Sequence, residues 1–402
     1  MAEWDVTTAS AGFEYLPADT VIQNSAHAID DNHFLCLHRG STNDFVVLEV
    51  DTSTWAVTTQ FFGLNIGSID SDNNIVQIDS THFVVGWDGG TELHIQTVEV
   101  DTSTWAVTTS ASALDIGAGN SPQNWTLKKF DTNHFLYEYR NGATNYMGIA
   151  EVNTSTWAVT TSASAYNVST AYQGWLNPAI ELIDANHVVS SYMKGSDGSD
   201  YLQVFAINTS TWAITAPGSE INIDTYGNDD LSKIDDTHML WCYYEDPDAD
   251  GYAQIITVNT STWAITTAAA ALEFDTQKGS RNKIAKVDTN HFIHTWEGGA
   301  SSHGYCEVLE VNTSTWVITT AGASVDFSTV IKYPAKLLGL DSEHYILNYS
   351  GPDDDGWIQV FEVDGGAVGP VNLKTFNEVA KASVKTIDST AIASVKSINT
   401  IV

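Results

Sequence analysis

Seven aspartate–histidine pairs are the residues of this 402-residue sequence best suited to chemistry. In each pair an apolar residue precedes the aspartate and the histidine follows three positions later, as in Ile29-Asp30 and His33. A carboxylate beside an imidazole can act as a general base or hold a metal ion, but one active site does not need seven copies. We therefore expect a structural role, in which the aspartate closes a turn and the histidine bonds the adjacent turn. The seven histidines are His33, His82, His134, His187, His238, His291 and His344.

One acidic loop has the spacing of a calcium ligand. The segment from Asp246 to Gly251 reads D-x-D-x-D-G, in which Asp246, Asp248 and Asp250 would converge on a cation and the glycine permits the turn. Position twelve is Thr257 instead of the bidentate glutamate of an EF-hand. A calcium site and a solvated acidic turn both remain open, and no other cofactor is expected.

Known catalytic signatures are missing from the sequence. It contains no Gly-x-Ser-x-Gly, no His-Glu-x-x-His and no Cys-x-x-Cys. Three cysteines, Cys36, Cys242 and Cys306, have neither the pairing nor the spacing of a disulfide framework or metal site. We predict that the protein is not an enzyme.

The net charge restricts the partners. Fifty acidic and sixteen basic residues give a formal charge of −34, which repels phosphate backbones, so we expect no nucleic-acid partner. No apolar run approaches the roughly eighteen residues that would predict a membrane helix. The N-terminus has no basic and apolar leader, so we expect a protein made in the cytoplasm, or exported by a route that the sequence does not show.

A ten-residue motif sets the period of the chain. It first reads VDTSTWAVTT and recurs every 50 to 55 residues, with a turn-forming Asx-Thr-Ser-Thr before each tryptophan. We expect these tryptophans to pack between sheets. They are Trp55, Trp105, Trp157, Trp212, Trp263 and Trp316, and a seventh, Trp4, begins an N-terminal stretch that matches the residues after Trp157.

Each repeat contains four short strand signals, here called A to D in chain order. Four strands in about fifty residues, repeated around a ring, are typical of a β-propeller. The sequence predicts an all-β fold over residues 1–364: a seven-bladed propeller of four-stranded blades, in which strand 3–9 completes blade seven. Closure of the ring by this strand removes the sheet edges that an open array would expose.

Two segments of blade two carry a family resemblance. Residues Phe83 to Gly90 end in a glycine pair, and residues Val98 to Trp105 join a strand, an Asp-containing turn and a tryptophan. They resemble the kelch-type blade, and the resemblance covers all seven blades in outline, although the glycine pair recurs only at Gly298-Gly299. It implies kinship of blade design and no particular activity.

Two columns of mostly aromatic residues flank the B–C loops. We expect both to pack blade against blade, with a glycan-stacking platform as the alternative. The first column is His38, Trp87, Tyr139, Tyr192, Tyr243, Trp296 and Tyr349. The second is Asp44, His94, Tyr146, Tyr201, Tyr252, Tyr305 and Trp357.

The B–C and D–A connections differ in every blade and should share one end of the propeller, here called the variable face. We expect the D–A connections to be loops that carry Phe61-Phe62, Trp125, Tyr166, Tyr172, Trp175 and Tyr226. Loops on a rigid scaffold commonly carry function. The candidate binding residues on this face are Arg39, Arg140, Tyr172, Trp175 and Tyr226.

Residues 365–402 differ from the rest in charge and period. Val384-Lys385-Thr386-Ile387 and similar stretches recur every eleven residues. Apolar residues step 3-4-4, as in a right-handed coiled coil, yet Val, Ile and Thr favour strands, so a coil and added strands both remain open. The tail also resembles short repeats that end many phage and marine viral structural proteins. We expect it to dock on other proteins or to form oligomers.

These observations lead to three hypotheses about function. The first is a non-enzymatic virion protein, attached by its tail as a capsid decoration or fibre component, that displays the propeller to host glycans or proteins. The second is a secreted or cell-surface lectin-like adhesin of a marine microbe. The third is a polysaccharide-acting propeller enzyme.

Overall fold

The computed structural model describes most of the first 365 residues. The described ranges are 4–16, 23–40, 43–70, 73–117, 122–170, 177–194, 199–223, 230–245, 249–299, 301–334 and 336–365. The chain divides into two units, Met1–Asp364 and Gly365–Val402. The predicted docking tail therefore lies almost wholly outside the described residues, and it stays a prediction.

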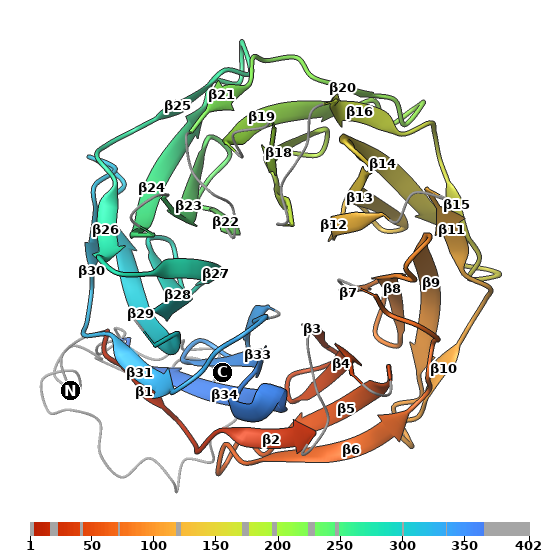
Figure 1. Cartoon of the computed structure of the whole chain (residues 1–402), viewed down its shortest axis with the longest axis horizontal. Helices are drawn as coiled ribbons and strands as arrows, with labels where there is room; N and C mark the ends of the chain where they lie inside the picture. Colours follow the sequence, from red (N-terminus) through yellow and green to blue (C-terminus); the bar gives the residue numbers. More distant parts are fainter. Residues whose placement is uncertain are drawn as a thin grey trace, which may run out of the picture. The chain divides into compact units, whose positions relative to one another are not determined.

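Seven antiparallel sheets stand around a central axis as the blades of a propeller (Figure 1). From the axis outward, blade one contains β3 (Gln23–Ala28), β4 (His33–Arg39), β5 (Phe45–Val50) and β6 (Val57–Gly63). Blade two contains β7 (Asn73–Gln77), β8 (His82–Asp88), β9 (Leu93–Val100), β10 (Val107–Thr109) and β11 (Leu114–Ile116). Blade three contains β12 (Gln123–Lys129), β13 (His134–Asn141), β14 (Thr144–Val152), β15 (Val159–Thr161) and β16 (Tyr166–Ser169).

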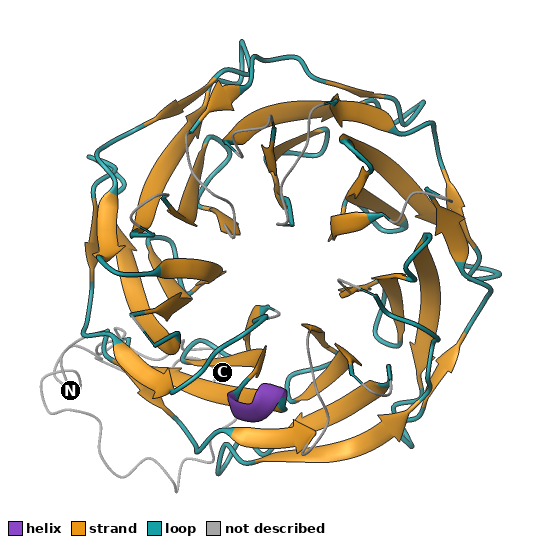
Figure 2. Ribbon diagram, in the orientation of Figure 1, coloured by secondary structure: helices purple, strands orange, loops and turns teal. Residues whose placement is uncertain are grey.

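The remaining blades repeat this order. Blade four contains β17 (Ala179–Leu182), β18 (His187–Met193), β19 (Asp200–Ile207), β20 (Ile214–Thr215) and β21 (Ile221–Asn222). Blade five contains β22 (Asp230–Lys233), β23 (His238–Tyr244), β24 (Gly251–Val258), β25 (Ile265–Thr267) and β26 (Leu272–Asp275). Blade six contains β27 (Gly279–Lys286), β28 (His291–Gly298), β29 (His303–Val311), β30 (Ile318–Thr320) and β31 (Val325–Ser328). Blade seven contains β32 (Leu337–Gly339), β33 (His344–Ser350), β34 (Gly356–Val363), β1 (Val6–Thr8) and β2 (Phe13–Leu16), with one short 3-10 helix, Pro352–Asp354, before β34. The prediction of a seven-bladed β-propeller is confirmed, and strands make up nearly all of its regular structure (Figure 2).

The core lies between neighbouring blades. The B strands are covered on both faces over most of their length, so that β8, for example, contains the buried run from Phe83 to Trp87 without a polar residue. Leu35 and Val47 of blade one, for example, belong to the same buried cluster as Phe83 and Val85 of blade two, and all four are 0% exposed. Burial of this kind is the main favourable term that holds the ring together.

The N-terminal segment closes the ring by completing blade seven. Val6 of β1 pairs with Val363 of β34. The Trp4 N–H donates to the Asp364 carbonyl at 2.6 Å, which is the bond that Trp55 N–H makes to the Asp51 carbonyl at the same distance inside an unbroken turn. The two chain segments thus rebuild the turn motif. Within the predicted strand 3–9 the structure has β1, and after an interruption the N-terminal segment pairs with β34 again through β2.

The outer D strands differ from the expectation in two respects. Each begins two residues after the tryptophan, because the tryptophan belongs to the turn, with φ between 58° and 68° in all seven copies. Outside blade one, D is also interrupted, and its second piece pairs with the same C strand.

Part of the expected D–A loops is therefore strand. Phe61 and Phe62 lie in β6 and Tyr166 lies in β16. Trp125 lies in the inner strand β12 and is 0% exposed. Among the described residues, no helix has the length and apolar character needed to cross a membrane.

Candidate functional site

The seven aspartate–histidine pairs occupy the seams between blades. In each pair the histidine Nδ1 lies 2.8–3.0 Å from a carboxylate oxygen of its own aspartate. The imidazole then stacks on the tryptophan of the next blade, with ring centroids 3.5–3.7 Å apart. His82 on Trp157 is one example, and His344 on Trp55 joins the last blade to the first. The expected bond from each histidine to the adjacent turn is wrong, because the ring bonds its own turn and stacks on the neighbouring blade.

The electrostatics of these pairs suit a structural role. Burial raises the pKa of Asp79. The backbone N–H groups of Thr81 and His82 and the His82 side chain together lower the pKa by more, so the net shift is downward. The equivalent aspartates show the same lowered pKa for the same reasons. The carboxylates are thus held ionised in seven separate seams, where they cannot act together on one substrate.

The two aromatic columns pack against the neighbouring blade, as expected, since Tyr139 belongs to one buried cluster with Val84 and Leu93 of blade two. They also pair within their own blades. Tyr139 and Tyr146 are directly opposite each other on β13 and β14, with centroids 5.6 Å apart. Four other blades have the same stacked pair, at 5.0–6.2 Å. The ring on strand B is buried in each of these pairs, so it does not offer an open face to a sugar.

The structure brings few of the predicted binding residues together. Arg39 ends β4 and is half-buried, whereas Arg140 lies in β13 of another blade and donates from Nη2 to Gln123 Oε1 at 2.6 Å. Tyr172, Trp175 and Tyr226 lie outside the described residues. The described part of the chain therefore places no two of the five predicted binding residues in one site.

The proposed calcium loop is described only at its end. Asp246 and Asp248 lie outside the described residues. Asp250 is half-buried, and its backbone carbonyl accepts a hydrogen bond from the Glu245 N–H at 3.0 Å. The calcium expectation is therefore open.

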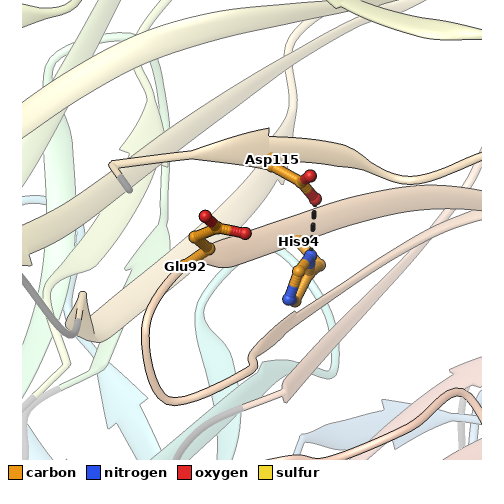
Figure 3. Close-up of side chains that lie close together, drawn as sticks. All are labelled: Glu92, His94 and Asp115. Carbon is orange, nitrogen blue, oxygen red and sulfur yellow. Dashed lines mark hydrogen bonds and ion pairs between the residues drawn. The ribbon is translucent and has the colours of Figure 1, made fainter. Parts of the chain in front are cut away.

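Another group of side chains could hold a metal ion. Glu92, His94 and Asp115 each place one donor atom within 4.8 Å of the others (Figure 3). His94 Nδ1 lies 2.7 Å from Asp115 Oδ1, and the imidazole stacks on Trp87. A Cβ at Gly89 would lie 2.3 Å from His94 Nε2, so glycine is needed there for the ring to fit. One imidazole and two carboxylates form a donor set that divalent transition metals accept, although Asp115 is exposed and one donor atom of each residue is already used in the His94–Asp115 contact.

A central cavity of about 880 Å³ runs between the inner strands of the seven blades. The whole chain has sixteen lysines and arginines and fifty acidic residues. Among the described residues that line the cavity, six are basic and two are acidic. The six cations are Lys128, Lys129, Arg281, Lys283, Lys286 and Lys336, and the two acids are Glu181 and Asp230. A cationic lining in so acidic a chain makes this cavity the strongest candidate site.

Some of these lysines fasten neighbouring blades. Lys129 Nζ donates to the carbonyls of Gln77 and Ile78 on the preceding blade, both at 2.9 Å. Lys286 Nζ repeats this contact with the Ile234 carbonyl at 2.8 Å. These two cations are therefore engaged by backbone oxygens at one end of the cavity.

The cavity's positive charge appears in the pKa values of two of its residues. Lys336 is exposed to the cavity, yet the surrounding strands separate it from bulk water, and this desolvation together with the charge of Lys128 lowers its pKa. His27 has its pKa lowered to about 4, first by burial and then by the charge of Lys336.

Sequence reasoning missed this site, although a signal for it was present. Lysines are rare in the propeller, and several lie in the segment just before an aspartate–histidine pair, which forms the innermost strand. A count of charge by strand position would have collected Lys128, Lys283 and Lys336 on the axis.

Comparisons with known proteins identify the fold alone. No family model and no curated protein sequence matches the chain. A protein from Bacteroides uniformis assigned as a 6-phosphogluconolactonase is similar in structure, with TM-score 0.60, 10% identity and coverage of 80% of this chain and 88% of that one. Its counterpart from Bacteroides fragilis has TM-score 0.57 and 10% identity over 76% and 83% of the two chains. A protein from Lactobacillus plantarum has TM-score 0.53 and 7% identity over 75% and 83%. At such identities the resemblance to kelch-type blades stays one of sequence pattern, and the chain is shown to be a β-propeller.

Proposed function

We propose that this chain is a non-enzymatic binding protein of a virion surface. It presents the propeller to host glycans or proteins, and residues 365–402 attach it to the particle or to further copies of itself. The observation that carries this proposal is that the repeated side chains and the variable side chains lie in different places. The repeated groups that could do acid–base chemistry are engaged in seven seams, whereas residues that differ between blades line the cavity.

The attachment half of the proposal rests on the sequence of the tail. Its lysines give it a positive charge opposite to that of the propeller, and its eleven-residue period resembles the ends of viral structural proteins. Light scattering should give a larger assembly for the full chain than for a chain ending at Gly365. Equal masses for both, in the presence of the other particle proteins, would contradict a docking tail.

The binding half is tested on a glycan array with the full chain. We expect selective binding that Trp175→Ala weakens, because this residue belongs to a D–A connection. A uniformly blank array would remove glycans as the ligand and leave proteins as the partner.

A cell-surface or secreted adhesin would bind glycans in the same way, but it would come from a cell and not from a virus particle. Mass spectrometry of purified virus particles separates the two, since only the virion protein is a stoichiometric component. Presence of the chain in cell-wall fractions alone would favour the adhesin.

A propeller enzyme is the remaining alternative. Its support is the similarity in fold to proteins assigned as 6-phosphogluconolactonases, which at 10% identity carries no residue over to this chain. Turnover of a lactone or polysaccharide by the purified chain would replace the proposal.

A further inference from the structure

We infer that the inner strands β27 and β32 form a site for an anionic ligand, with Lys283 and Lys336 as its cationic contacts. This inference rests on the proposed function, since it names the chemical class that the propeller would bind. The shared chemistry is a carboxylate, sulfate or phosphate group, free or carried on a sugar.

The two lysines lie at the same height in the cavity. Lys283 is four residues before Val287, and Lys336 is four residues before Leu340. Val287 and Leu340 each begin the A–B turn, with an N–H that donates to the carbonyl of His291 or His344 at 2.9 or 2.8 Å. Lys283 lies in β27 and Lys336 directly precedes β32, so the two lysines occupy equivalent positions in adjacent blades, and both line the cavity.

Neither ammonium group has a hydrogen-bond or ion-pair partner among the described residues. Lys128 differs in this respect, since its Nζ lies 2.8 Å from Glu181 Oε2. The other acid of the lining, Asp230, accepts hydrogen bonds from the backbone N–H groups of Leu231 and Ile284 at 3.0 and 2.9 Å. Desolvation and the charge of Lys128 lower the pKa of Lys336 by more than the charges of Asp230 and Glu181 raise it. An anion in the cavity would offset this unfavourable positive charge.

Arg281 adds a planar donor to the same lining. Its Nε lies 3.2 Å from Glu297 Oε2, and its guanidinium stacks over the Tyr333 ring at 4.5 Å. Its Nη1 is buried and has no hydrogen-bond partner in the described part of the chain. The ion pair and the ring contact fix the guanidinium in the lining, where its positive charge adds to the attraction for a carboxylate, sulfate or phosphate group.

The test is calorimetric titration of the full chain with four probes: inorganic phosphate, a hexuronate trisaccharide, a sulfated disaccharide and a neutral trisaccharide. We expect at least one anionic probe to bind at least tenfold more tightly than the neutral one, with an affinity that falls as salt rises. Lys283→Gln and Lys336→Gln should each weaken that binding at least tenfold. Lys194→Gln, which removes a positive charge outside the cavity lining, should leave it unchanged.

A spectroscopic readout accompanies the titration. The His27 pKa, followed by NMR, should rise when the anion binds, because the ligand offsets the charge of Lys336. Thermal unfolding of both glutamine variants checks that they fold, and we expect no loss of stability because neither ammonium group has a hydrogen bond to lose among the described residues.

The outcomes separate this inference from the proposed function. Binding of the neutral trisaccharide alone, unaffected by either lysine variant, would overturn the anion site and leave the glycan function standing. Binding of phosphate but of no sugar would support the site and argue against glycans as the ligand. An equal loss in Lys194→Gln and the cavity variants would show unspecific attraction and overturn the site.

Discussion

At the scale of single residues, the seam tryptophans are the most unusual feature of the structure. All seven adopt a left-handed backbone conformation, with φ between 58° and 68°, which costs about 1–2 kcal/mol for a residue other than glycine. Each is held there by a backbone bond of 2.6 Å to the Asx carbonyl and by the imidazole stacked on its ring. The stack therefore stabilises a turn that the backbone alone disfavours.

Substitutions at Trp157 separate the stack from the backbone strain. Trp157→Ala and Trp157→Gly both lose the contact with His82 and should lower the free energy of unfolding by about 2–4 kcal/mol. Glycine carries no left-handed penalty, so the glycine variant should be about 1 kcal/mol more stable than the alanine variant, as measured by urea unfolding. At the neighbouring Ala158, where φ is not positive, Ala158→Gly should instead destabilise; the same order of stability at both positions would contradict the argument.

Glu138 is a buried carboxyl group that links blades three and four. It is 0% exposed and accepts hydrogen bonds at 2.5 Å from Asn145 Nδ2 of its own blade and Ser190 Oγ of the next. Burial raises its pKa to about 8, and the two hydrogen bonds offset only part of that rise. The folded protein thus holds this proton at pH values where the unfolded chain has released it.

The pH dependence of stability follows from that shift. A raised pKa contributes stability that is fully present below about pH 4.5 and is lost as the pH rises through about 8. Between these limits the free energy of unfolding of the parent should fall by an amount on the order of a few kcal/mol, and Glu138→Gln should remove this fall. The thermal midpoint of the variant should then decrease less from pH 5 to pH 8 than that of the parent. The exposed Glu343→Gln should keep the parental slope, and parallel curves for Glu138→Gln and the parent would argue against a buried proton.

At the scale of elements, the B–C loops combine a rigid hairpin base with a variable tip. In blade five the base is Tyr243 opposite Tyr252, stacked at 5.7 Å, and the tip contains the D-x-D-x-D-G segment. The stacked pair fixes the two chain segments that lead into and out of the loop, and such preorganisation lowers the cost of binding a cation.

Calcium binding by this loop can be measured on the whole chain. If the loop is a calcium site, calorimetry with calcium should show a saturable heat that Asp248→Ala abolishes, because alternate carboxylates supply the ligands. Asp355→Ala in another acidic loop is the matched control and should leave that heat unchanged. Absence of heat in the parent protein would favour the solvated turn.

At the scale of the whole molecule, closure by the N-terminus makes each end of the chain depend on the other. β1 and β2 both pair with β34, and Trp4 stacks on His291 of blade six at 3.6 Å. Removal of residues 1–16 should therefore expose a sheet edge and one seam together, with loss of the cooperative transition and aggregation as the expected result.

A circular permutant tests the rebuilt turn directly. Joining Asp364 to Trp4 through Thr-Ser-Thr restores the motif of the other blades, and new ends can be opened between residues 195 and 198. Because the bonds of Trp4 to Asp364 already match those of an unbroken turn, the permutant should fold with a thermal midpoint no lower than that of the parent. A permutant that unfolds at clearly lower temperature would show that the native ends are not equivalent to the other turns.

Much of the fold is readable from the sequence because it depends on local patterns that repeat. The Asx-Thr-Ser-Thr turn, the apolar runs and the period near fifty residues predict the strands, their number and the place of the N-terminal segment. Errors arose where a residue's role depends on its neighbours in space: Trp125 reads as part of a loop but lies buried in β12.

The sequence by itself determined the propeller, its seven blades and its closure, since each follows from spacing along the chain. Only the tertiary structure decided which residues meet across the seams and around the axis. Each histidine of the seven pairs stacks on the tryptophan of the next blade, and Lys283 and Lys336 line one cavity, because the ring sets one blade beside the next. Spacing in the sequence does not contain that geometry, and the candidate site exists only because the ring closes around it.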